Sequence, residues 1–308
     1  MPGGVGAGRA AGAWYLTGIT GGIGAAVAVG RLLGLDEDHM LWAIGIAAAR
    51  AAGSRETHGT MAKNLVPACA AEAGIFAALL AQHDMMAPEA PIEGKRGLGC
   101  LVAEGADFTA ITRGLGQRFE LMGNAYKPFP SGIVTHAAIT AALELAHDAA
   151  PDPAAIAAVR LTVNPLCLEL CGRREPANAL EGTFSVYHWV AIALSERAIG
   201  IRHFSDAMVR DAAITALRGR VSAQADPGYG KDEAAIEVTL QDGRTLRRHV
   251  AHALGTIERP PSDAELTAKL VDLAAVRLPR RRAEALAALC WRLASEPDAA
   301  VLVAAVRP

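Results

Sequence analysis

Residues 127–136 read Lys-Pro-Phe-Pro-Ser-Gly-Ile-Val-Thr-His, and this stretch divides the chain into two kinds of sequence. Its two prolines hold the backbone extended, because proline fixes its own φ and keeps the preceding residue out of the helical region. Ahead of the stretch the sequence is rich in alanine and glycine and has helical spacing, whereas the first β-type segments follow it. We therefore expect a helical domain over residues 1–123 and a different architecture from residue 124.

The β-type segments consist of one strand and one later hairpin. Residues 156–163 alternate alanine with valine and leucine, as a strand does. Residues 235–240 and 245–250 flank Asp242-Gly243, a dipeptide that favours the tight turns of β-hairpins. These segments predict a sheet in the second part of the chain.

Helical patterns occupy most of the remaining sequence. Asp36 and Thr135 are expected to cap the helices that follow them. Ser262, after Pro260-Pro261, favours a return to helices that continues to the end. The predicted helices cover residues 37–52, 66–83, 135–147, 184–198 and 205–218.

The order of these segments predicts the architecture. A length of 308 residues favours about two domains, each large enough for its own core. The simplest arrangement is a multi-domain α and α+β fold, with an all-helical domain built from both ends of the chain. In it, residues 1–123 and 261–308 form the helical domain, and residues 124–260 form an inserted α+β lid domain.

Composition excludes several classes of protein. The formal charge is −2 and no basic stripe is present, so the sequence offers no footprint for nucleic acid or an anionic membrane. The longest apolar runs, 41–49 and 299–306, are shorter than the roughly 20 residues of a membrane span, and no signal peptide opens the chain. Five cysteines, an odd number, indicate reduced core cysteines in a cytoplasmic protein.

The segment Thr17-Gly-Ile-Thr-Gly-Gly-Ile-Gly24 matches the phosphate loop of short-chain dehydrogenases. That function requires a strand before the loop, but the preceding AGRAAGAWYL is not rich in valine or isoleucine. No Tyr-x-x-x-Lys pair is present either. We therefore interpret the segment as the glycine-rich start of a helix that packs closely on its neighbours.

Lysine is scarce, with only five among 30 basic residues. Lys63 ends the segment THGTMAK, which joins two predicted helices and places His58 and Thr60 near it. Lys127 precedes the proline stretch, and His136 falls in the first turn of the next helix, whose N-terminus favours anions. From spacing alone, each lysine also has a structural interpretation. Lys63 could simply reach solvent, and the segment after Lys127 could be a proline-stiffened linker between domains.

Taken together, three segments are similar to the MmgE/PrpD family, and the similarity covers the chain from about Trp14 to its end. The family includes 2-methylcitrate dehydratase, cis-aconitate decarboxylase and iminodisuccinate epimerase, so the resemblance implies a small polycarboxylate substrate and no metal or organic cofactor. It also implies a helical domain plus an α+β lid, usually in a homodimer, with the active site in the cleft between domains. The segments are GTMAKNLVPACAAEAGIFAALLA (59–81), KPFPSGIVTHAAITAALELA (127–146) and LCGRREPANALEGTFSVYHWVAIAL (170–194).

The resemblance also assigns roles to residues. Lys63 and Lys127 become the active-site lysines, which would hold substrate carboxylates and offset the carbanion charge that develops beside one of them. Tyr187 matches a tyrosine of the same cleft, and Tyr15 or His58 would help to transfer the proton. Further residues are expected to contact the substrate: Thr17, Thr60, Ser131 and His136.

The sequence departs from the family pattern in three ways. Tyr15 stands where members carry a histidine before Pro-Thr, and Gly132 stands where decarboxylase-type members carry a second one. These changes argue against cis-aconitate decarboxylation. The chain also starts at the glycine-rich loop, without the helical segment that opens other members. The alternative function is therefore a truncated or degenerate scaffold, inactive until a separate polypeptide supplies the N-terminal helices.

A few other residues have chemistry that the sequence alone leaves open. Cys167 and Cys171 have a spacing that could ligate a metal, but no second pair completes a site, so we interpret them as packing residues and predict no metal. Arg173 and Arg174 could bind a carboxylate or be surface charges. His249 and His252 flank the end of the hairpin and are expected in solvent.

Overall fold

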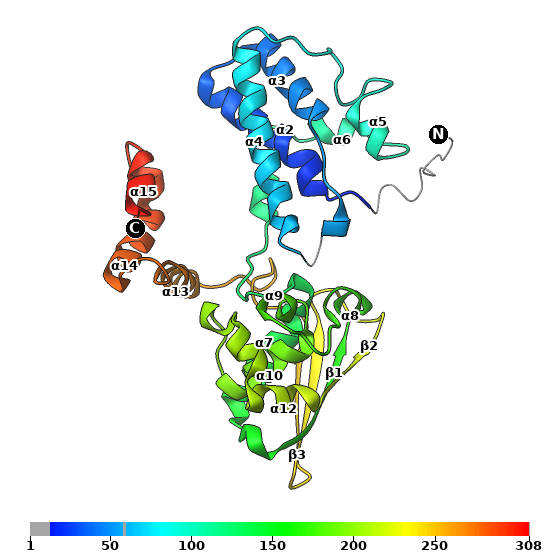
Figure 1. The fold of residues 1–308 in the computed structure, drawn as a ribbon, viewed down its shortest axis with the longest axis vertical. Coiled ribbons are helices and arrows are strands. Elements are labelled where there is room, and N and C mark those ends of the chain that lie inside the picture. The colour runs from blue at the N-terminus through cyan, green and yellow to red at the C-terminus, as the bar shows by residue number, and fades with distance from the viewer. Residues whose placement is uncertain (1–12, 58–59, 308) are drawn as a thin grey trace. The chain divides into compact units, whose positions relative to one another are not determined.

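The structure, a computed structural model, describes residues 13–57 and 60–307. It divides into two compact units, Met1–Phe119 and Glu120–Pro308 (Figure 1). The first is built from helices, and the second contains helices around a four-stranded sheet. The fold is thus mixed α and α+β, which confirms the fold class that the sequence predicts. The helices after residue 261 are part of the second unit, and their predicted return to the helical domain stays a prediction.

Three long helices form the body of the first unit. Asp36 caps the second of them by accepting a hydrogen bond from His39 N at 3.0 Å, as predicted. Gly34 ends the first helix in the left-handed conformation, with φ of 72°. The helices are α2 (Leu16–Leu33), α3 (Glu37–Ala49) and α4 (Ala62–Gln82), followed by the short α5 (Leu98–Val102) and α6 (Thr109–Thr112), and a 3₁₀ turn spans Arg55–Thr57.

The core between these helices consists mainly of alanine, and glycines let the backbones approach. A side chain at Gly18 would overlap the carbonyl oxygen of Ala52, and one at Gly74 would meet Gly22 O at 2.5 Å. Helix α2 runs straight through the dehydrogenase-like glycine motif, so that segment forms no phosphate loop. The interpretation of a glycine-rich, closely packed helix start is confirmed.

Helices α2 and α4 are long and apolar enough to cross a membrane by length and composition alone, although the sequence analysis found no such run. Only 28% and 33% of their apolar windows are buried. Core helices of soluble proteins pass the same test, and these two pack along each other. Their length is therefore weak evidence for a membrane, but much of their apolar surface is open.

The sheet of the second unit has the strand order β2-β1-β3-β4, with β1 and β2 parallel and the other pairs antiparallel. The predicted strand and hairpin are confirmed. Strand β2 is an additional edge strand that the sequence analysis did not identify. The strands are β1 (Ile156–Val163), β2 (Val221–Ala225), β3 (Ala234–Leu240) and β4 (Thr245–Val250).

Helices cover one side of this sheet (Figure 1). The core between the layers contains Ile139, Ile192 and Trp189 from the helices and Leu161 and Ile236 from the strands, all at most 2% exposed. The helices of this part are α7 (His136–Ala149), α8 (Pro165–Cys171), α9 (Ala179–Gly182), α10 (Val186–Glu196), α11 (Asp206–Arg210) and α12 (Ala212–Gly219). Short 3₁₀ segments span Glu120–Gly123, Ile133–Thr135, Pro153–Ala155 and Ile201–His203.

The chain closes with helices that follow the sheet. Ser262 and Glu265 form a capping box at the start of the first one, which confirms the predicted cap. Thr135 stands at the N-cap position of α7, as predicted, but its hydroxyl accepts no capping hydrogen bond and lies 2.9 Å from Ser131 Oγ and 2.8 Å from Gly132 O. The closing helices are α13 (Asp263–Ala274), α14 (Arg280–Arg292) and α15 (Ala300–Ala305), with a 3₁₀ turn at Leu293–Ser295.

The cysteines correct a further expectation. Cys167 and Cys171 are buried packing residues, as predicted, but Cys69, Cys100 and Cys290 are exposed and do not belong to a core. All five are free thiols.

Candidate active site

Lys127 lies on an extended segment that two other elements hold by its backbone. The N–H of Tyr126 donates to Gly255 O at 2.7 Å, and the ammonium of Lys269 on α13 donates to the carbonyl oxygen of Lys127. Gly255 has φ of +100°, and an added Cβ there would overlap Tyr126 O, so this approach requires glycine. The side chain of Lys127 is exposed, whereas the backbone around it is held at Tyr126 N and at Lys127 O.

His136 begins α7, as the sequence predicts, and its ring is buried with 1% exposure. It packs edge-on against Phe129, with ring centroids 5.2 Å apart. Among the described residues, neither ring nitrogen has a partner at good hydrogen-bond geometry, although backbone groups of Ser131 and Phe129 lie close enough to favour the protonated form. Burial, followed by the charge of Lys127, lowers the pKa of His136 to about 3. The imidazole is therefore neutral at physiological pH and too weak a base to accept a proton there.

Three chain segments meet beside the proline stretch. Gly132 N donates to Thr183 O at 3.0 Å, which joins the stretch to the residues before α10. A Cβ at Gly132 would overlap Cys171 Sγ, so the thiol fills the space beside the glycine. Burial raises the pKa of Cys171 to about 11, against the opposing effect of the Lys127 charge. Ser131, only 2% exposed, accepts the hydroxyl of Thr135 and faces the protein interior.

Tyr187 lies in the first turn of α10, after Ser185 caps that helix by accepting from His188 N at 3.2 Å. The ring is 5% exposed, and the guanidinium carbon of Arg174 is 4.5 Å from its centroid. This distance is that of a cation–π contact. Arg174 is exposed, but it also donates to Val221 O at 3.4 Å, so its side chain is tied to β2 as well as to Tyr187.

The candidate residues of the first unit gather at one end of its helices. Lys63 is half-buried in the first turn of α4, and its backbone N–H donates to Thr60 O at 3.3 Å. The hydroxyl of Thr60 donates to Thr57 O at 2.7 Å. His58 lies outside the described residues.

The first turn of α2 lies against the first turn of α4, where Val66 packs over Gly18. Tyr15 immediately precedes α2, and its N–H donates to Gly53 O at 3.1 Å. Thr17 is exposed in the first turn of the same helix. The structure therefore brings Tyr15 and Thr17 to the same end of the bundle as Lys63.

Each unit thus contains one of the two lysines. Lys127 acts electrostatically on His136 and Cys171 in the second unit, and Arg174 joins Tyr187 there. The sequence alone leaves the role of Arg174 open and gives no role to Lys269. The motif LCGRREP contains Arg174, but its stacking on Tyr187 depends on a tertiary contact with a segment 13 positions away.

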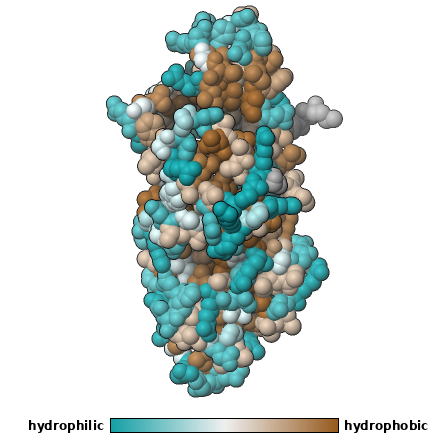
Figure 2. Space-filling model, turned by 90° about the vertical axis from the view of Figure 1, so that its left-hand side faces the viewer, coloured by the Kyte–Doolittle hydropathy of each residue, from teal (hydrophilic) through white to brown (hydrophobic). Residues whose placement is uncertain are grey.

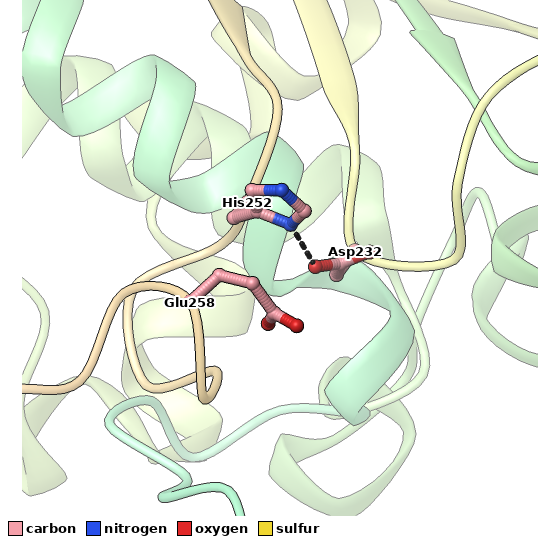
Figure 3. Close-up of side chains that lie close together, drawn as sticks. All are labelled: Asp232, His252 and Glu258. Atoms are coloured by element: carbon pink, nitrogen blue, oxygen red, sulfur yellow. Dashed lines mark hydrogen bonds and ion pairs between the residues drawn. The ribbon is translucent and has the colours of Figure 1, made fainter.

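One group of side chains in the described part of the chain has the composition of a metal site (Figure 3). The potential ligand atoms of Asp232, His252 and Glu258 lie within 4.8 Å of one another. His252 Nδ1 is 2.8 Å from the Asp232 carboxylate, and this hydrogen bond raises the pKa of His252. While the imidazole holds a proton it cannot bind a cation, and in that state the group is an ion pair between the turn before β3 and the loop after β4.

The expectation that the hairpin histidines lie in solvent is confirmed, since both are about half exposed. Each also has a carboxylate partner. His249 Nε2 is 2.8 Å from Glu233, in parallel with the contact of His252 to Asp232.

Two family models match the chain. The MmgE/PrpD N-terminal domain matches residues 5–111, and the MmgE/PrpD C-terminal domain matches residues 129–293. The matches place the protein in a class of dehydratase- and lyase-type enzymes. The chain belongs to the MmgE/PrpD family, which confirms the resemblance found in the sequence. No curated protein matches the chain in a direct comparison.

Proposed function

We propose that the protein is a cofactor-independent lyase or epimerase acting on a small di- or tricarboxylate such as 2-methylcitrate. Family membership supports a reaction of the dehydratase or lyase type. The observation that carries the proposal is the placement of Lys127, whose charge acts on two buried groups from different elements, His136 and Cys171. A cation carried on a backbone that is held in place, beside several converging segments, suits the binding of a carboxylate.

The chemistry assigns a part to each group. Removal of a proton next to a carboxylate places negative charge on that carboxylate, and an ammonium already in position offsets it without reorganisation. Lys63 and Lys127 fill this role in the proposal, and Tyr187 transfers a proton through its hydroxyl. Tyr15 and His58 are the candidates for a second proton transfer. His136 is neutral and enclosed, so we assign it to packing.

Packing at Gly132 bears on the type of reaction. Decarboxylase-type members carry a histidine at this place, but Cys171 Sγ occupies the corresponding space here. The site therefore lacks an imidazole that decarboxylation would use. Dehydration or epimerisation fits the residues present better.

A substrate panel tests the proposal. The purified chain is incubated with 2-methylcitrate, cis-aconitate and iminodisuccinate, and products are followed by chromatography. We expect turnover of at least one of them and a loss of about 10²- to 10³-fold in Lys127→Ala, the usual effect of removing a group that stabilises developing charge. Lys231→Ala, at an exposed turn, is the matched control and should retain activity. The absence of turnover for every substrate would contradict the proposal.

The proposal also covers the finer architecture. We propose that both ends of the chain build the helical domain around an inserted α+β lid, and that the protein is a cytoplasmic homodimer. Family membership supports this arrangement. Sedimentation of the purified chain tests the dimer, because a monomer at micromolar concentration would contradict it.

A second candidate function is a scaffold that is inactive until a partner polypeptide with apolar helices binds. The observation that favours it is the open apolar surface on the first unit (Figure 2). Large patches of this kind are typical of interaction surfaces. On α4, four large apolar side chains are between 42% and 62% exposed: Leu65, Ile75, Phe76 and Leu79. Turnover by the chain alone that disappears in Lys63→Ala would exclude this candidate.

A further inference from the structure

The second unit contains a cavity of about 580 Å³ next to the segment of Lys127. Three elements enclose it: residues 126–130, residues 198–203 and helix α13, with Leu254 and Pro261 completing the wall. The volume is in the range of small-molecule sites, which typically combine apolar walls with a few charged groups.

The walls of this cavity are largely apolar. Phe129 is 6% exposed and forms a rigid part of the wall, whereas Leu273 on α13 is 45% exposed and lies at the surface. Apolar side chains arranged in this way can cover a hydrocarbon or aromatic body. The other apolar residues of the wall include Pro128, Ile199, Ile201, Leu254 and Leu266.

Lys269 supplies a positive charge to the same cavity. It is half-buried on α13, and its ammonium donates to the backbone carbonyl of Lys127, which is a neutral acceptor. Within the described residues no carboxylate forms an ion pair with Lys269. An ammonium has three donors, so the contact with one carbonyl leaves capacity for an anion.

Arg202 is a second cation of the wall. Its Nε donates to Nε2 of His203 at 3.2 Å, which anchors the guanidinium at the cavity. Burial lowers the pKa of His203, so this partner is neutral and does not offset the charge of Arg202. The carboxylate of Glu196 lies 3.7 Å away and is a loose partner.

Two carboxylates line the cavity but already have backbone donors. Asp272 Oδ2 accepts from Ile201 N at 3.0 Å, and Glu265 accepts from Ser262 N at 2.7 Å. Two carboxylates therefore line the cavity against three cations, Lys127, Lys269 and Arg202, of which Arg202 also pairs loosely with Glu196 outside the lining. The balance favours an anionic ligand over a cationic one.

We propose that this cavity binds a small organic acid, with its carboxylate on Lys269 and its apolar body against Phe129 and the leucines of α13. The ammonium of Lys269 beside a largely apolar wall favours an acid with an apolar body over an anion without one. Binding here requires no turnover, so the inference goes beyond the proposed lyase or epimerase activity.

Calorimetric titration of the full-length chain with 4-phenylbutyrate tests this inference. The neutral analogue 4-phenylbutyramide keeps the apolar body without the charge, and citrate has the charge without that body. We expect 4-phenylbutyrate to bind at least about tenfold more tightly than either, since a charge-assisted hydrogen bond and apolar burial act together. Equal affinity for acid and amide would overturn the proposal, as would the absence of binding.

Variants locate the site. Lys269→Met retains the aliphatic stem and removes the charge. It should weaken the binding of 4-phenylbutyrate about tenfold and leave the affinity for 4-phenylbutyramide unchanged. Lys269→Arg should restore most of the affinity, and Lys231→Met is the matched control at an exposed turn. Unchanged affinity in Lys269→Met would overturn the assignment. Since the probe is no polycarboxylate substrate, its failure to bind would leave the activity test on Lys127 unaffected.

Discussion

The buried ring of His136 has a measurable consequence for stability. Its pKa of about 3 in the folded protein lies below the ordinary value of 6.5 that the unfolded chain has. Between these values the unfolded state binds more protons, so stability rises with pH and falls as the pH decreases through this window. His188, also buried, has a pKa lowered to about 4 by burial and then by Arg218, and it contributes in the same direction.

We therefore expect the free energy of unfolding to decrease by up to about 1.4 kcal/mol per pH unit for each such histidine below pH 6.5. Urea unfolding of wild type and His136→Leu at pH 7.5, 6 and 5 measures the effect. In the variant, the free energy of unfolding should depend less steeply on pH, by the equivalent of about one bound proton. His147→Leu, exposed on the same helix, is the control. An identical slope in wild type and His136→Leu would show that the ring is not enclosed as described.

The contact of Gly132 with Cys171 permits a second prediction at the residue scale. Gly132→Ala adds a methyl group that overlaps the thiol, and we expect a loss of about 1–3 kcal/mol, as for other overpacked interiors. Cys171→Ala should relieve part of that loss in the double variant. A double-mutant cycle by chemical unfolding gives the coupling energy. Additive losses would contradict the contact.

At the scale of elements, Gly255 and Gly243 form a matched pair in the second unit. Both have positive φ, +100° and +86°, but only at Gly255 would a Cβ overlap another segment, at Tyr126 O. Gly243→Ala therefore introduces backbone strain alone, about 1–2 kcal/mol. Gly255→Ala adds the overlap and displaces the segment of Lys127. We expect an additional loss of about 1–3 kcal/mol and lower turnover, measured by thermal unfolding and the substrate assay. An equal cost at both glycines would contradict this placement of Lys127.

Local chemistry explains which elements the sequence could predict. Asp36, Ser262 and the Asp242-Gly243 turn act within a few residues, and each is found as predicted. Strand β2 (Val221–Ala225) was missed because it is short and mostly exposed, and it forms only through pairing with β1 more than 50 residues earlier. Thr135 has the residue type of a cap, but Ser131 and Gly132 offer its hydroxyl nearer partners.

The candidate site was predictable only in part for the same reason. Lys127, Tyr187 and Lys63 were identified through family motifs. The stacking of Arg174 on Tyr187 and the contact of Lys269 with Lys127 join residues distant in sequence, and no spacing rule reports them. The burial of His136 likewise depends on the packing of Phe129 over it.

At the scale of the whole molecule, family membership is the firmest functional result, since the two matches together extend from residue 5 to residue 293. The alanine-rich core of the first unit is thin, and exposed side chains such as Leu65 and Phe76 leave apolar surface on α4. This surface separates the two candidate functions. An enzyme active alone needs no cover there, whereas a scaffold depends on a partner that binds it.

The central claim is that Lys127 stabilises a carbanion formed next to a substrate carboxylate. Hydrogen–deuterium exchange of the substrate in D₂O, followed by proton NMR, detects that step whichever product forms. With the substrate found in the panel, we predict enzyme-dependent loss of the C–H signal next to a carboxylate, reduced at least about 100-fold in Lys127→Ala and retained in Lys231→Ala. Exchange at the wild-type rate in Lys127→Ala, with the variant folded, would contradict the account.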